Sequence, residues 1–335
     1  MRIGVIDGRA VLITIDGTVI DVASASGGRF GPDPMTIYEE WEAFVPHART
    51  LVGGGGHAIA SSSDDGRWGI PVPRPRQVFA VGMNYAEHAK EAGVAEPIEP
   101  AVFTKFVTSL TGPFGQVALP AGNVDWEVEL VAVIGRGGRD ITVEEAWAHV
   151  AGLTVGQDLS ERVLQRVGPV PQFSLAKSYA GFGPIGPFVV TPDELSNPDD
   201  LELGCMINGD YVQRSRTSKM IFPVPVLVAK LSAVTELLPG DLIFTGTPSG
   251  VGVARTPPRF LAVGDELISY VEKIGQMRQT FAGAVTSGSV DSAGVHLADV
   301  FPAHQVWLYA TVLTIGYMIS RGLAKAGSQQ HYDER

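Results

Sequence analysis

The sequence predicts a mixed, β-rich α+β fold. From residue 78 onward, short runs rich in β-branched and aromatic residues alternate with Gly- and Pro-rich stretches, a spacing typical of neighbouring strands. Among these runs, only residues 142–151 and 222–237 have helical composition. Many short strands with few helices favour a barrel or sandwich over a doubly wound parallel sheet.

A small N-terminal α+β domain is expected over residues 1–70. Residues 2–22 alternate short β-rich runs with two Asp-Gly dipeptides, which suit tight hairpin turns and predict an antiparallel meander. Residues 34–50 follow Asp33, a favoured N-cap type, and space their apolar side chains helically, which predicts one amphipathic helix. Residues 53–77 combine Gly, Ser and Pro as linkers do, which places the boundary.

The chain changes character again after the second predicted domain, residues 71–282. Residues 283–335 comprise a stretch of flexible composition and an apolar run, 306–320, that predicts a C-terminal helix. This run falls short of the ~20 apolar residues that span a bilayer. We expect the helix to mediate self-association or docking, with a membrane span as the alternative.

Composition narrows the class of protein. The net charge of −11, from 36 acidic and 25 basic residues, lacks the basic surface that a nucleic-acid binder needs. Cys205 is the single cysteine, which rules out an internal disulfide and fits a reducing compartment. The first residues carry acids where a signal peptide would be apolar, so a cytoplasmic location is expected.

Glu127 and Glu129 interrupt an otherwise apolar run, residues 124–135. Alternate residues of a strand point to the same face, so two carboxylates would share one face of a strand that is apolar on both. Unpaired buried carboxylates are costly and raise each other's pKa, which a divalent cation would relieve. The alternative is a strand that begins at a solvated edge.

Asp158 directly follows another strand-like run, residues 152–157, and supplies a third acid. Three oxygen donors suit Mg²⁺, Mn²⁺ or Ca²⁺ better than zinc, and they leave positions for water and substrate. Alternatively, Asp158 caps a helix formed by the segment that follows it.

His88 and Glu91 are three residues apart, so on a helical turn they lie on one face and can form a hydrogen bond. A carboxylate beside an imidazole orients it and raises its basicity, as a general base that activates water requires. The alternative is a solvated helix face, because neighbouring side chains are also charged.

Two further stretches offer groups for an anion. Lys177 lies among small and apolar residues. It is either a buried cation that stabilises an oxyanion or holds a substrate carboxylate, or an ordinary surface lysine. Thr247 belongs to a Gly-rich turn after a strand, and the turn's amides can hold an anionic group. No lysine follows at P-loop spacing, so a nucleotide site is not expected.

Six segments in order, GMNYAEH, WEVEL, GQDLSERVLQ, LAKS, INGDYVQ and IFTGTPSGVG, resemble the fumarylacetoacetate hydrolase family over roughly residues 73–281. The resemblance implies a mixed β-sandwich roll with a catalytic Mg²⁺ or Mn²⁺ at its mouth, with Ca²⁺ able to substitute structurally, and a homodimer. The tail departs from the family, most of whose members end near residue 281. The matching positions are Glu127, Glu129 and Asp158 for the metal; His88, Glu91 and Lys177 for catalysis; and Arg162, Gln165 and Thr247 for the substrate.

The implied activity is metal-dependent hydrolysis of a carbon–carbon bond in a 1,3-dicarbonyl acid of the acylpyruvate or fumarylacetoacetate type. The same metal site also suits an oxaloacetate decarboxylase or a keto–enol tautomerase. The sequence leaves this choice open, because loop shape selects the substrate. A non-enzymatic alternative is a scaffold that assembles through the tail, although the intact set of site residues argues against it.

Overall fold

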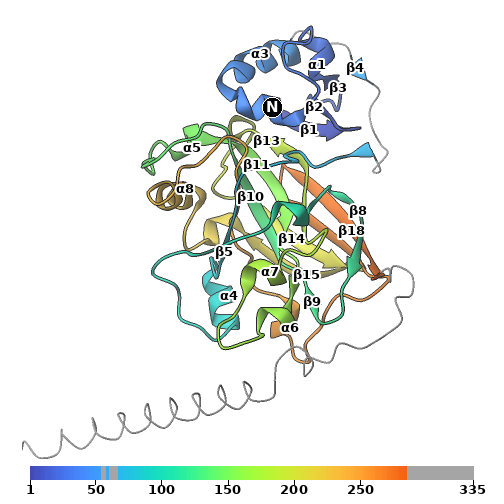
Figure 1. Cartoon of the computed structure of the whole chain (residues 1–335), viewed down its shortest axis with the longest axis vertical. Helices are drawn as coiled ribbons and strands as arrows, with labels where there is room; N and C mark the ends of the chain where they lie inside the picture. Colours follow the sequence, from blue (N-terminus) through green and yellow to red (C-terminus); the bar gives the residue numbers. More distant parts are fainter. Residues whose placement is uncertain (54–57, 60–66, 285–335) are drawn as a thin grey trace, which may run out of the picture. The chain divides into compact units, whose positions relative to one another are not determined.

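The computed structural model describes residues 1–53, 58–59 and 67–284 (Figure 1). Residues Met1–Ala284 form one compact unit. The predicted C-terminal helix lies outside the described residues, and the domain boundary near residue 70 stays a prediction. Within the described part, no helix is both long enough and apolar enough to cross a membrane.

The chain is built mainly from strands, as predicted. The largest sheet contains, in spatial order, β4 (Ala58–Ile59), β3 (Val19–Asp21), β2 (Arg9–Ile13), β1 (Arg2–Ile6), β13 (Gly183–Val190), β11 (Val150–Gln157), β10 (Val128–Ile134), β16 (Leu242–Phe244), β5 (Val78–Gly82) and β6 (Ala101–Thr104), with β7 (Leu110–Thr111) paired to β13. A second sheet contains β15 (Asp210–Arg216), β14 (Glu202–Ile207), β17 (Glu266–Val271), β18 (Gly275–Gly283) and β8 (Phe114–Leu119). A short ribbon joins β12 (Ser160–Glu161) to β9 (Val124–Asp125).

Helices are short and lie around the sheets (Figure 1). The α-helices are α1 (Val22–Ala25), α2 (Pro34–Glu39), α3 (Trp41–Gly53), α4 (Ala86–Glu91), α5 (Ala146–His149), α6 (Arg162–Gln165), α7 (Phe173–Ala176) and α8 (Val224–Ser232). The 3-10 turns are η2 (Val107–Ser109), η3 (Pro192–Glu194), η4 (Thr217–Lys219) and η5 (Gly252–Ala254).

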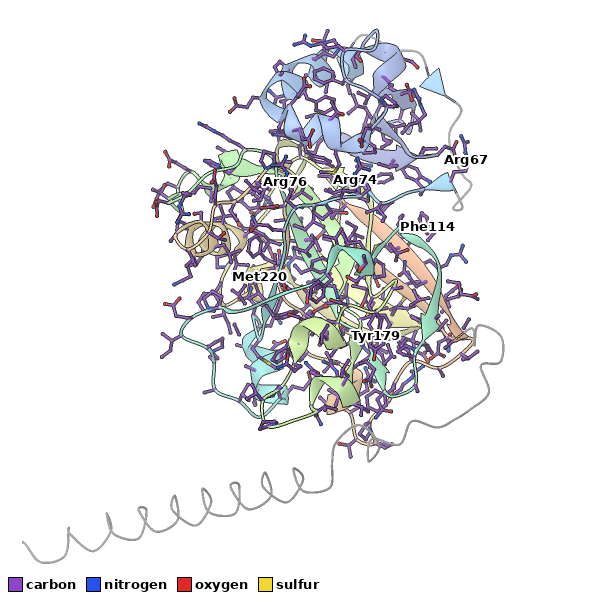
Figure 2. All side chains as sticks on the ribbon, in the orientation of Figure 1. Arg67, Arg74, Arg76, Phe114, Tyr179 and Met220 are labelled. Carbon is purple, nitrogen blue, oxygen red and sulfur yellow. The ribbon has the colours of Figure 1, made fainter. Side chains whose placement is uncertain are left out.

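Strand β10 is buried on both faces, which explains its apolar sequence. Leu130 and Ala132 pack in a cluster with side chains of the second sheet and of α8. Val131 and Val133 point the other way and pack with α2 and α3. Side chains fill the space between these layers (Figure 2), so the strand that carries the glutamates runs through the middle of the core.

The N-terminal meander forms as predicted, and β1 also pairs with β13, so these strands extend the large sheet. The prediction of one helix over residues 34–50 is wrong, because the helix breaks at Glu40. Asp33 caps α2 through the amide of Met35. The break turns the chain so that Tyr38 of α2 and Phe44 of α3 are both buried in one cluster.

Candidate active site

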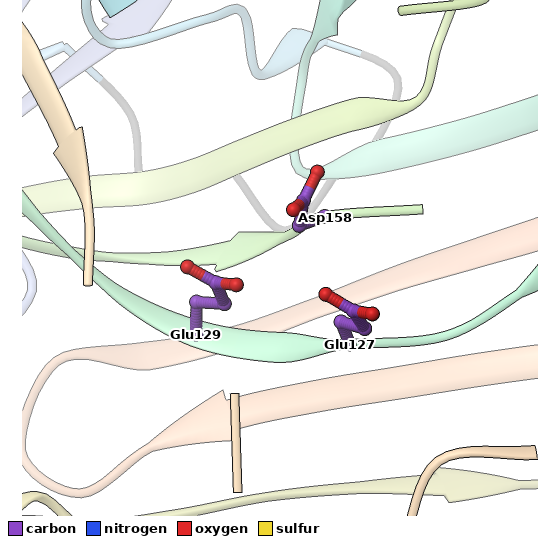
Figure 3. Close-up of side chains that lie close together, drawn as sticks. All are labelled: Glu127, Glu129 and Asp158. Atoms are coloured by element: carbon purple, nitrogen blue, oxygen red, sulfur yellow. The ribbon is translucent and has the colours of Figure 1, made fainter. Parts of the chain in front are cut away.

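Three buried carboxylates lie close together where β10 begins and β11 ends (Figure 3). Glu127 precedes β10, Glu129 is its second residue, and Asp158 follows β11. The two strands are antiparallel, and the Asp158 amide donates to the Glu127 carbonyl oxygen over 2.9 Å. One oxygen from each acid lies within 4.8 Å of the others. The strand therefore does not begin at a solvated edge.

Asp158 does not cap the helix that follows it. Helix α6 begins at Arg162, and its N-cap is Glu161, whose carboxylate accepts two amides of the first turn. The Asp158 side chain instead accepts hydrogen bonds from two ammonium groups. Lys105 Nζ lies 2.7 Å from Oδ1, and Lys177 Nζ lies 2.6 Å from Oδ2.

Lys177 and Arg162 hold the first glutamate between them. Lys177 is buried rather than on the surface, and its Nζ lies 2.7 Å from Glu127 Oε2. Arg162 Nη2 lies 2.7 Å from Glu127 Oε1, and its Nε lies 2.9 Å from Asp125 Oδ2. Asp125 also accepts the Gly252 amide over 2.7 Å, so it connects Arg162 to the Gly-rich turn.

Among the described residues, the charges of this buried network do not balance. Burial raises the pKa of Glu127, but the charges of Lys177 and Arg162 outweigh it and lower the pKa to about 2. Burial, followed by the charges of Asp158 and Glu127, raises the pKa of Glu129 well above its usual range. The network sets four carboxylates against three cations: Asp125, Glu127, Glu129 and Asp158 against Lys105, Lys177 and Arg162. Of these four carboxylates, Glu129 is the one with which no described cation forms an ion pair.

This imbalance fits a divalent cation. The donor set is all oxygen, which suits Mg²⁺, Mn²⁺ or Ca²⁺. Glu127 and Asp158 keep acceptor capacity, because each carboxylate oxygen has two lone pairs and each is engaged by one ammonium or guanidinium group. A cation held by these two residues and Glu129 would also favour the charged form of Glu129 and so oppose the rise that burial and the neighbouring carboxylates cause in its pKa.

A histidine–glutamate pair lies on α4, as the spacing predicts. His88 Nδ1 lies 3.1 Å from Glu91 Oε2, and the His88 side chain is buried. The Gly250 amide donates to both oxygens of Glu91, over 2.9 and 3.1 Å. Glu91 is therefore held from two sides, and it fixes the ring so that Nε2 is the remaining nitrogen of His88.

The Gly-rich turn contacts the acids through its backbone. The Gly246 amide donates to Glu129 Oε2 over 2.8 Å. Gly246 has a φ of +98°, and a Cβ there would come within 2.7 Å of the Asn84 Cβ, so the turn requires glycine. The Thr247 hydroxyl donates to the Val128 carbonyl oxygen over 2.9 Å, which anchors the turn to β10.

A cavity of about 450 Å³ opens onto this network. Glu129 and Asp158 do not line it and are almost fully buried. The other predicted site residues line it: His88, Glu91, Glu127, Arg162, Gln165, Lys177 and Thr247. The structure thus brings the predicted residues together, and their roles stay predictions.

Sequence reasoning missed three residues of this region. Lys105 and Asp125 belong to the buried network, and Arg166 lines the cavity. The signal for Lys105 is a lysine in the apolar run AVFTKF, and for Asp125 it is a third acid in VDWEVEL. Arg166 carries no comparable signal, because an arginine in a polar loop is ordinary.

Comparison with known proteins gives this geometry its context. Residues 77–282 match the model of the fumarylacetoacetate (FAA) hydrolase C-terminal family. The human protein "Oxaloacetate tautomerase FAHD2A, mitochondrial" is 46% identical over 207 residues, which are 61% of this chain and 66% of that protein. This chain thus spans just under two thirds of that relative's length.

Two solved structures are similar over 85% of this chain and the whole of the other. A Mycobacterium smegmatis protein with the provisional name HpcE is 60% identical, with a TM-score of 0.80. Maleylpyruvate hydrolase from Sphingobium sp. SYK-6, in complex with manganese(II) and pyruvate, is 27% identical, with a TM-score of 0.69. Hydrolases and tautomerases thus both occur among the relatives, and on the span and order of its matched segments this chain belongs to the fumarylacetoacetate hydrolase family.

Proposed function

We propose that the protein is a metal-dependent hydrolase that cleaves a carbon–carbon bond in a 1,3-dicarbonyl acid of the acylpyruvate type. The observation that carries this proposal is the placement of the His88–Glu91 pair on the cavity that Glu127 also lines. A hydrolase needs a base for water beside an electrophilic site, and a metal bound beside Glu127 would supply that site next to His88.

Glu127, Glu129 and Asp158 would hold the metal, which we propose to be Mg²⁺ or Mn²⁺. When bound, such an ion polarises a substrate carbonyl as a Lewis acid. The relative that binds manganese and pyruvate supports this choice. Lys177 lies where its ammonium can stabilise an oxyanion or a substrate carboxylate, and Arg162, Gln165 and Thr247 border the same space.

His88 supplies the proton transfers. With Nδ1–H donated to Glu91, the Nε2 lone pair accepts a proton from water, whose oxygen bonds to the distal carbonyl carbon. The carbon–carbon bond then breaks, and its electron pair stays on the departing pyruvate enolate. The proton on Nε2 is then transferred to the methylene carbon of the enolate, which yields pyruvate and a carboxylic acid.

The test is cleavage of acetylpyruvate, measured as the loss of its ultraviolet absorbance. The assay is run with Mg²⁺ or Mn²⁺ and then with excess chelator. We expect acetate and pyruvate in equal amounts, loss of turnover with chelator, and recovery on adding metal back. Absence of cleavage of both acetylpyruvate and maleylpyruvate, with either metal, would refute the hydrolase.

Oxaloacetate tautomerisation is the second candidate, because the human relative carries that name. The same His88 nitrogen can move a proton between carbon and oxygen without consuming water. Side-by-side assays decide: interconversion of the keto and enol forms of oxaloacetate without acetylpyruvate cleavage would favour the tautomerase. Release of carbon dioxide from oxaloacetate would instead indicate the decarboxylase.

A homodimer and a cytoplasmic location remain proposals. Relatives include proteins named as mitochondrial, so location is best measured on a tagged full chain. Light scattering on a sizing column measures the oligomeric state, and comparing the full chain with a chain ending at residue 284 tests the predicted role of the tail in assembly.

A further inference from the structure

We propose that Arg166 binds a second carboxylate of the substrate, so that the preferred substrate is a dicarboxylic 2-oxo acid. This inference rests on the proposed function only in that the cavity takes a 2-oxo acid. It assigns a specificity residue and a substrate class, and it applies equally to hydrolysis and tautomerisation.

Arg166 is placed by the same helix as Arg162. It is the C-cap residue of α6, and its amide donates to the carbonyl oxygens of Val163 and Leu164. Residues four apart on a helical turn lie on one face, about 6 Å apart along the axis. Both arginines line the cavity, Arg162 as a buried residue and Arg166 as an exposed one.

The two arginines differ in what they bind. Arg162 is engaged by Asp125, Glu127 and Gln165. Among the described residues, no carboxylate forms an ion pair with Arg166, and no hydrogen bond from its side chain is found. Lys177, the other cation that lines the cavity, donates to two carboxylates. Arg166 is therefore the lining cation whose charge is left for a ligand.

The rest of the lining gives a second carboxylate few other partners. Much of it is apolar, including Val94, Phe103, Pro171, Phe173 and Val253. Glu91 is an acid held by His88 and the Gly250 amide, so it would repel an anion. A planar guanidinium offers two parallel donors to a carboxylate, a geometry that a lysine would not provide.

The test compares two ligands of equal chain length that the enzyme does not cleave. 2-Oxoglutarate has a distal carboxylate, and 2-oxopentanoate has a methyl group in its place. Calorimetry with the full chain and saturating Mn²⁺ gives both dissociation constants. We expect wild-type protein to bind 2-oxoglutarate about tenfold more tightly, equivalent to about 1.4 kcal/mol.

Arg166→Gln should remove that preference by weakening 2-oxoglutarate binding alone, and Arg166→Lys should restore part of it. Arg214→Gln is the matched control, because it removes one positive charge from an exposed arginine paired with Glu202, outside the cavity. Equal affinities in wild-type protein, or equal losses for both ligands in Arg166→Gln, would overturn the inference.

The outcome is separable from the activity. Acetylpyruvate has no second carboxylate, so Arg166→Gln should lower the ratio of kcat/KM on maleylpyruvate to kcat/KM on acetylpyruvate about tenfold. Failure of wild-type protein to cleave either substrate would refute the hydrolase, whereas the two binding constants would still decide the role of Arg166. Binding of neither 2-oxo acid would overturn the role of Arg166.

Discussion

Lys105 Nζ lies 2.7 Å from Asp158 Oδ1, and both side chains are buried. Lys105 Nζ also donates a hydrogen bond to the Phe182 carbonyl oxygen over 3.2 Å. Lys177 holds the other oxygen of the same carboxylate. Asp158 is thus oriented by two fixed cations while it keeps lone pairs for a metal.

Replacing Lys105 should therefore weaken metal binding without removing a ligand. We expect Lys105→Met to raise the Mn²⁺ dissociation constant about 10- to 100-fold, the usual effect of losing a group that orients a ligand. Calorimetry measures this, with Lys219→Met as the exposed control and circular dichroism as the check on folding. Wild-type affinity in a folded Lys105→Met protein would show that Asp158 needs no such support.

Glu129 is the predicted ligand whose charge the protein leaves uncompensated. Glu129→Gln keeps the shape and removes the charge, so we expect Mn²⁺ affinity to fall at least about 100-fold, beyond the range of the Lys105 change. Glu39→Gln, on the exposed side of α2, is the control. Full affinity in Glu129→Gln would mean that the metal lies elsewhere.

His88 should matter for chemistry and not for the metal. His88→Ala is expected to lower kcat for acetylpyruvate about 10²- to 10⁴-fold, because it removes the general base, and to change the Mn²⁺ dissociation constant less than about threefold. His149→Ala, outside the cavity, should change neither. Loss of metal together with activity would contradict the assignment of His88 as the base.

Asp21 tests the N-terminal strands. A hydrogen bond from Arg9 is the main cause that lowers the pKa of Asp21 from 3.8 to about 2. A lowered carboxyl pKa stabilises the fold above pH 3.8, and this contribution is lost as pH falls through about 2. Arg9 is partly exposed, so we expect Asp21→Asn to cost about 1 kcal/mol at pH 7 after solvent screening.

Urea unfolding at pH 7 and at pH 3 or below measures this contribution. The difference between wild type and Asp21→Asn should shrink at the lower pH, whereas Asp199→Asn, at an exposed position, should differ little at either pH. A cost that does not change with pH would assign the effect to the cap of α1 rather than to charge.

Local pattern was enough to predict that three acids lie close together, because their positions follow from strand periodicity; their role as metal ligands stays a prediction. Glu127 and Glu129 are two residues apart at the start of β10, and Asp158 directly follows β11, its antiparallel neighbour. The His88–Glu91 contact follows from helical spacing for the same reason. Each of these placements depends on residues close in sequence or on the regular spacing of a strand or helix, and the sequence shows such patterns directly.

Long-range contacts were not predictable in this way. Lys105 and Asp158 are 53 residues apart in the sequence, and the residues next to either one do not indicate that the two form an ion pair. The break at Glu40 was also hidden, because Ile37, Trp41 and Phe44 are spaced as on one continuous helix, whereas α2 ends at Glu39 and α3 begins at Trp41. Arg166 stands out only because it has no ion-pair partner among the described residues, and the sequence around it does not show this.

Strand β1 pairs with β13, so backbone hydrogen bonds join the N-terminal strands to the rest of the large sheet although residues 53–77, between them in sequence, have the composition of a linker. Residues 188–190 of β13 exchange backbone hydrogen bonds with residues 2–4. Cutting the chain near residue 70 would leave those groups as an open edge, and an open edge invites pairing with other molecules. In the intact chain, β1 covers this edge of β13, so these backbone groups are already paired within the molecule and offer no edge to a second molecule.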